Sequence, residues 1–134
     1  MRSGRLAFVV VVCLPVALSL AYPSEALEPG DEAPPLSLEA IIGAPEGVDL
    51  SWEALRGNVV VLRFWALGCS PCVAPIPYLN EVVDELDDEL LVVISITDNQ
   101  ADPVARFLER QPIAGWTGID TDRSVFAAYD VEYI

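Results

Sequence analysis

The stretch VVVLRFWALGCSPC, residues 59–72, joins an apolar run to a pair of cysteines. Its first half, residues 59–65, is apolar except for Arg63 and is rich in β-branched and aromatic residues. A continuous apolar run of this length is typical of a strand that is covered on both faces, as in a parallel sheet. The stretch therefore predicts a buried strand that leads directly to Cys69 and Cys72.

Strand and helix patterns alternate after the cysteines. The predicted elements are a helix over 79–90, a buried strand over 90–96, a helix from 102 to about 110, a less regular strand over 116–119 and a short helix over 124–130. This order predicts βαβ crossovers and an α/β fold with a mostly parallel central sheet flanked by helices. The cysteines then lie between the carboxyl end of a strand and the first turn of a helix, where sites form in such sheets.

The segment before the first strand has a different character. Residues 23–35 are rich in Pro, Glu and Ala and are typical of a tether. Apolar stretches at 36–38 and 48–50 flank a turn that contains Gly and Pro, which predicts a hairpin. Ser51 is a suitable cap for a short helix that ends at Gly57.

The N-terminus carries the pattern of an export signal. Arg2 and Arg5 precede an apolar run over 6–21, and small residues follow where a signal peptidase could cut. We therefore expect residues 1–26 to be a signal peptide or an N-terminal membrane anchor, and residues 27–134 to form one domain. The protein is expected to be periplasmic or otherwise extracytoplasmic, with no membrane contact beyond this segment.

The charge balance argues against one class of partner. The chain has seven Lys+Arg and 21 Asp+Glu residues, which gives a formal net charge of −14. Proteins bind nucleic acid phosphates through basic patches, so we expect no nucleic acid partner. The hydrophobic fraction of 53% predicts a folded chain with a buried core.

Three chemistries fit a Cys-x-x-Cys unit. Zinc needs about four ligands, but the chain has no histidine and its remaining cysteine, Cys13, lies in the export segment, so we expect no metal or other cofactor. A structural disulfide stays possible in an exported protein, although so short a loop constrains little of the unfolded chain. Redox exchange is favoured because a helix start stabilises a thiolate, with Cys69 as the expected attacking thiol and Cys72 as the resolving one.

Several motifs over residues 29–134 match one family. They are GDEAPPLSL, LRGNVVVLRFWA, the C-S-P-C unit, Pro77, YLNEVVDEL, VVISIT and YDV. By these motifs the chain resembles the TlpA/ResA-like branch of the thioredoxin superfamily, exported thiol–disulfide oxidoreductases with a redoxin (AhpC/TSA-like) domain. The resemblance implies a thioredoxin-like fold, Cys69 and Cys72 as the catalytic, redox-active pair, and a helix that Pro77 kinks. It implies as partners client proteins with cysteine pairs and an upstream thiol electron donor.

Three positions depart from the family's pattern. Gly68 stands where a bulky residue is usual, which predicts an open rim beside Cys69. Pro75 stands where many members carry a Glu, and Arg63 stands where thioredoxin has a buried acid. An arginine near the site would stabilise a thiolate and make the disulfide more oxidising, whereas an arginine that points outward would only reach the surface.

The chain stops at Ile134, where the family continues with a cis-proline loop, further strands and a final helix. We therefore expect a C-terminally truncated domain that is weakly folded. The expected function is that of an exported thiol–disulfide oxidoreductase that reduces disulfides of other exported proteins, such as in cytochrome c maturation. The alternative is a redox-inactive thioredoxin-like module that binds a partner or serves structurally.

Overall fold

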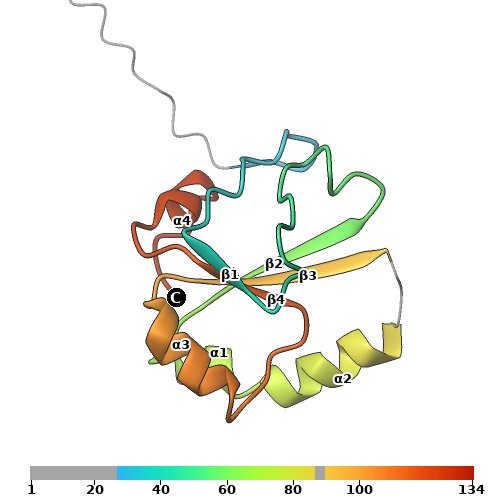
Figure 1. Ribbon diagram of the computed structural model, residues 1–134. Helices are drawn as coiled ribbons and strands as arrows, with labels where there is room; N and C mark the ends of the chain where they lie inside the picture. The colour runs from blue at the N-terminus through green and yellow to red at the C-terminus, as the bar shows by residue number, and fades with distance from the viewer. Residues whose placement is uncertain (1–26, 87–89) are drawn as a thin grey trace, which may run out of the picture.

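The sheet is built mainly from parallel strands (Figure 1). The computed structural model describes residues 27–86 and 90–134, so the predicted export segment lies outside the described residues. The elements are β1 (Ala40–Ile42), β2 (Val59–Trp65), α1 (Ser70–Val73), α2 (Ile76–Leu86), β3 (Leu91–Thr97), α3 (Ala101–Leu108), β4 (Trp116–Ile119) and α4 (Ser124–Ala128). Over these residues the strands form one four-stranded sheet with the order β1-β4-β3-β2. None of the helices described is long and apolar enough to cross a membrane.

The register of the central strands follows the predicted pattern. Strands β2 and β3 pair in parallel along their whole length, from Val59 opposite Leu91 to Trp65 opposite Thr97. Strand β4 pairs with β3 in parallel, and β1 pairs with β4 in the antiparallel direction. The α/β fold with a mostly parallel sheet is confirmed, and the three strands predicted after residue 58 are present as β2, β3 and β4.

Side chains alternate between the two faces of the sheet. One face carries Ile96 and packs against Phe126 of α4 and against the segment before β1. The opposite face carries Trp65 and Ile119, which pack against Val104 of α3, and all three side chains are fully buried. Figure 1 shows α1, α2 and α3 together on this second side of the sheet. The predicted cover of the strand that leads to the cysteines is present at its carboxyl end, where Trp65 is fully buried, whereas Val59 and Val61 near its start are exposed.

The segment before β2 differs from the prediction. No hairpin joins residues 36–38 to 48–50 in the described part of the chain; instead, β1 pairs with β4. Leu38 packs directly over Gly118 of β4, where an added Cβ would lie 2.6 Å from the leucine side chain. Burial against a distant strand has outweighed the local turn signal.

Two smaller predictions in the helices were wrong. Residues 51–57 form turns rather than a helix, because so short a stretch needs tertiary packing to hold it. The Trp52 indole Nε1 within it donates instead to the carbonyl of Pro34 at 2.9 Å. Helix α3 begins at Ala101 rather than at residue 102, with Gln100 as its N-cap, and Asp102 lies in the first turn, where its negative charge is favourable.

Candidate active site

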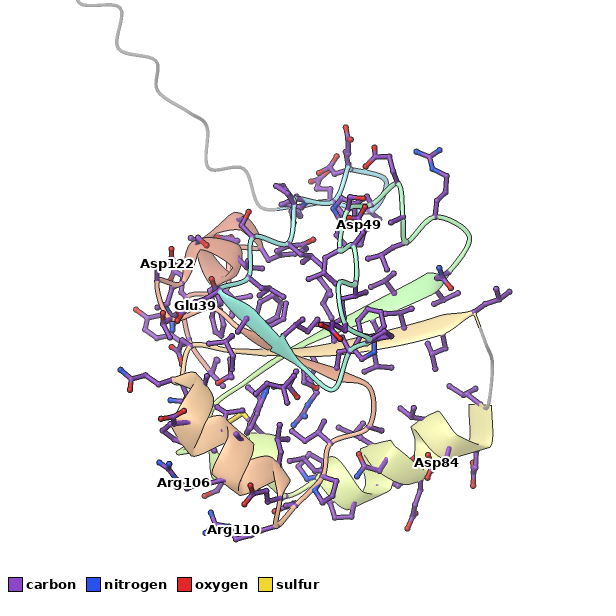
Figure 2. The ribbon with its side chains drawn as sticks, viewed as in Figure 1. Glu39, Asp49, Asp84, Arg106, Arg110 and Asp122 are labelled. Carbon is purple, nitrogen blue, oxygen red and sulfur yellow. A yellow bond between two sulfur atoms is a disulfide. The ribbon has the colours of Figure 1, made fainter. Side chains whose placement is uncertain are left out.

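Cys69 and Cys72 are joined by a disulfide at the start of α1. Their Cα atoms lie 5.2 Å apart. Cys69 is the N-cap residue, and its carbonyl accepts hydrogen bonds from the backbone N–H groups of Cys72 and Val73 at 2.9 and 3.0 Å. Figure 2 shows the sulfur–sulfur bond in yellow beside α1 and α3. The structure thus joins the two predicted site residues, and their separate roles stay a prediction.

The surroundings of the two cysteines differ, although both side chains are half-buried. Cys72 packs against the buried cluster that contains Trp65 and Val104. Cys69 follows Gly68, which is exposed, and a Cβ added there would meet no atom within 4 Å. The rim beside Cys69 is therefore open, as the glycine predicted, while the other half of the disulfide lies against the core.

The helix after the disulfide is broken soon after it begins. Helix α1 is a single turn, and a turn at residues 74–75 separates it from α2. Pro77 has no N–H for the carbonyl of Val73, which Gln111 Nε2 approaches at 3.5 Å instead. The predicted effect of Pro77 is thus present as an interruption. Because α1 is so short, its dipole is small, and nearby charges matter more for a thiolate.

Arg63 places a positive charge next to Cys72. Its side chain lies on the sheet face that α1 and α2 cover, and Nη2 donates a hydrogen bond to the carbonyl of Cys72. Burial lowers the pKa of the Arg63 guanidinium, but an arginine with an ordinary pKa above ~12 keeps its charge at neutral pH. The alternative in which Arg63 points outward to the surface is therefore wrong.

Asn99 holds the loop between β2 and α1. Its Oδ1 accepts the backbone N–H of Leu67 at 2.7 Å and the hydroxyl of Thr97 at 3.2 Å. Asn99 was not among the predicted site residues. A signal was available, because it follows a predicted strand and the carboxyl ends of neighbouring parallel strands meet at one edge of a sheet.

Arg123 makes a second set of contacts at this edge. It forms an ion pair with Asp98, which follows β3, and its Nη2 donates to the carbonyls of Val131 and Glu132 at 3.1 Å each. Its guanidinium lies 4.6 Å from the ring centroid of Phe126. Arg123 therefore ties the end of β3 to the last residues of the chain, a contact that the sequence pattern did not predict.

The chemistry available at the site is that of thiols. Within residues 27–86 and 90–134, no group of three or more His, Cys, Asp or Glu side chains is placed to hold a metal ion. A Cys-x-x-Cys pair exchanges two electrons between a dithiol and a disulfide, and the bridged pair seen here is the oxidised state.

Known proteins are similar to this chain in sequence. The model of the AhpC/TSA family matches residues 29–133. The chain is 24% identical to the thiol-disulfide oxidoreductase ResA of Bacillus thuringiensis (strain Al Hakam), over 98% of this chain and 79% of that protein. It is 29% identical to the thiol-disulfide oxidoreductase ResA of Bacillus subtilis (strain 168), over 80% of this chain and 58% of that protein.

Two solved structures are similar to this one. A putative thiol-disulfide oxidoreductase from Bacteroides vulgatus superposes with a TM-score of 0.53 at 19% identity, over 62% of this chain and 60% of that one. The structure of MTB dsbF in its mixed oxidized and reduced forms superposes with a TM-score of 0.54 at 26% identity, over 61% of each chain. The present chain thus spans less than two thirds of either structure. The predicted thioredoxin-like fold is confirmed by these neighbours.

Proposed function

Because this chain belongs to the AhpC/TSA family, as a TlpA/ResA-like member of the thioredoxin superfamily, we propose that it reduces disulfides of other exported proteins through Cys69 and Cys72. The predicted enzyme class, thiol–disulfide oxidoreductase, is confirmed by relatives of that name. The observation that carries the proposal is the bridge between two half-buried cysteines at a helix start, beside an open rim. We include proteins of cytochrome c maturation among the proposed clients.

The proposed reaction begins with the reduced pair. The Cys69 thiolate attacks one sulfur of a client disulfide, so that a bond forms between the two proteins and the client's own sulfur–sulfur bond breaks. The other client sulfur leaves as a thiolate and takes a proton from solvent. The Cys72 thiolate then attacks Cys69 Sγ, which forms the bridge seen in the structure and releases the second client thiol. Two electrons have passed to the client, and an upstream thiol donor restores the dithiol.

The surroundings of the pair support this division of roles. Cys69 is next to the open rim at Gly68, where a client could approach, while Cys72 is held against the core. Arg63 bonds to the Cys72 carbonyl and supplies a positive charge near the resolving sulfur. A cation there favours the thiolate form that the second step requires.

Trapping of the mixed disulfide tests the roles. The Cys72→Ser variant keeps the attacking thiol but lacks the resolving one, so it should accumulate disulfide-linked complexes with client proteins on non-reducing gels. The Cys69→Ser variant should accumulate none. Equal trapping by the two variants, or trapping by neither, would contradict the assignment.

A redox titration tests the enzymatic function itself. The oxidised fraction of the Cys69–Cys72 pair should change reversibly across a series of glutathione buffers, and the reduced protein should reduce a model protein disulfide. A redox-inactive binding module would show neither behaviour.

A reporter fusion tests the proposed location. A phosphatase that is active only outside the cytoplasm, fused after residue 40, should be active because residues 1–26 direct export. A stable but inactive fusion would show that the export proposal is wrong.

A further inference from the structure

Arg123 has a backbone conformation that its residue type rarely adopts. It is the N-cap residue of α4, and its φ of 60° lies in the left-handed region. Glycine adopts this region without strain and asparagine adopts it occasionally, whereas other residues pay a steric penalty there. Strained conformations of this kind persist where the surrounding structure holds them, often close to functional sites. The contacts of the Arg123 side chain must therefore offset the strain of its backbone.

The guanidinium of Arg123 joins three separate segments. Nη1 forms the ion pair with Asp98, directly after β3, and Nη2 donates to the carbonyls of Val131 and Glu132. The guanidinium also lies over the ring of Phe126, which is fully buried. A partly exposed ion pair contributes little by itself, but here one cation is shared among a carboxylate, two carbonyls and a ring. Neither glycine nor asparagine could make this set of contacts, which accounts for an arginine at this position.

The partner of Arg123 leads directly to the loop before Cys69. Asp98 is followed by Asn99, whose Oδ1 accepts the backbone N–H of Leu67 at 2.7 Å. Leu67 lies two residues before Cys69. Arg123 follows β4 and Asp98 follows β3, and these two are the inner strands of the sheet. A chain of contacts made between described residues therefore runs from Arg123 to the loop that carries the predicted attacking thiol.

The conformation of this loop matters because helix α1 is only one turn long. A helix of this length is not stable by itself, so its first turn depends on the residues that lead into it. The backbone N–H of Cys69 donates to the carbonyl of Ala66 at 3.1 Å, and Cys69 is the N-cap with an extended backbone. Free N–H groups at a helix start stabilise a thiolate only while the sulfur lies beside them. A loop without its bond at Leu67 would hold the sulfur there for less of the time.

We propose that Arg123 is a positioning residue for Cys69, which acts through Asp98 and Asn99 on the loop between β2 and α1. Arg123 fixes the carboxylate of Asp98, the fixed backbone directs the Asn99 side chain to Leu67, and the loop then presents the Cys69 thiol in its reactive form. The inference rests on the proposed function, in which Cys69 attacks a client disulfide. Reaction of the Cys69 thiol with a small reagent needs no client, so the contact chain can be tested independently of that function.

Alkylation of reduced Cys69 by iodoacetamide, a neutral reagent, measures this reactivity when it is followed on the peptide that contains Cys69. Arg123→Gln should slow the reaction about threefold or more at pH 7, and the difference should vanish near pH 10, where the thiol of every variant is ionised. Asp98→Asn should slow it as well, and the double variant should be no slower than the slower single variant, because both residues act in one chain. A direct effect of charge would instead make Asp98→Asn faster, since an anion near the thiolate is removed. That result would overturn the proposal.

Further variants separate the side chain of Arg123 from its backbone. Arg123→Gly suits the left-handed conformation and should fold, yet it should react as slowly as Arg123→Gln because the guanidinium is absent. Arg123→Lys keeps a cation opposite Asp98 and should restore part of the rate. Arg106→Gln makes the same charge change on the exposed surface of α3 (Figure 2) and should react like the wild type. A wild-type rate in a folded Arg123→Gly protein would overturn the proposal, while the trapping of clients by Cys72→Ser would still report on the proposed function.

Discussion

Replacing Arg63 by Gln should make the Cys69–Cys72 disulfide more reducing. The guanidinium donates a hydrogen bond to the carbonyl of Cys72. From the lengths of this hydrogen bond and of the covalent bonds between the carbonyl and the side chain, we estimate that the charge lies roughly 6 Å from the Cys72 sulfur. At an effective dielectric constant of about 20, two unit charges at that distance interact by about 3 kcal/mol. Arg63 is only half-buried, so solvent screening reduces the expected effect to about 1 to 2 kcal/mol.

The sign follows from which redox state carries the charge. The cation stabilises a thiolate, which exists only in the reduced protein, so the native reduction potential is raised. Loss of the cation should lower the potential by about 20 to 40 mV, because about 30 mV corresponds to 1.4 kcal/mol for a two-electron couple. The difference should shrink at acidic pH, where both thiols are protonated and carry no charge for Arg63 to stabilise.

Equilibration with glutathione buffers, followed by alkylation of the free thiols, measures this potential. Arg106→Gln is the matched control, because it removes an exposed charge from α3 and should leave the potential unchanged. Circular dichroism should show that Arg63→Gln is folded. A potential that is unchanged or higher in a folded Arg63→Gln protein would refute the electrostatic role of this residue.

Three further predictions concern stability and the loop beside the site. Asn99→Ala removes the acceptor of the Leu67 N–H and should lower the free energy of unfolding in urea by about 1 kcal/mol. Client disulfides should also be reduced more slowly, and an unchanged rate of client reduction would show that the loop does not need this bond. Asp120 is buried, and its carboxylate accepts hydrogen bonds from two backbone N–H groups at the start of α4. Asp120→Ala should therefore lower the free energy of unfolding by about 2 kcal/mol, and a melting temperature equal to that of the wild type would contradict this role. Burial raises the pKa of Tyr129 above its ordinary value of 10.0, and its hydroxyl donates to Pro34. As pH rises, the unfolded chain therefore loses this proton first, so the Tyr129 contribution to stability is complete below about pH 10 and falls above it. Tyr129→Phe should reduce the loss of unfolding free energy at alkaline pH, and an equal loss in the variant would rule out Tyr129 as its source.

The sequence by itself determined the elements that carry the active site. The run over residues 59–65 became β2 with the predicted bounds, because β-branched and aromatic residues favour strands. The position of Cys69 as a helix cap followed in the same way, since Pro71 suits a first helical turn. Each of these features depends on the chemistry of residues that are neighbours along the chain.

The tertiary structure alone decided how distant segments meet at that site. Residues 40–42, which lie between the arms of the predicted hairpin, form β1 and pair with β4. The Asn99 side chain accepts a hydrogen bond from Leu67 in the loop that follows β2. Alternation along β2 placed Arg63 on one face of the sheet, but only the packing of α1 and α2 on that face turned its charge toward Cys72. Contacts of this kind depend on which helix covers which face, and local sequence patterns do not contain that information because it arises from burial shared between remote residues.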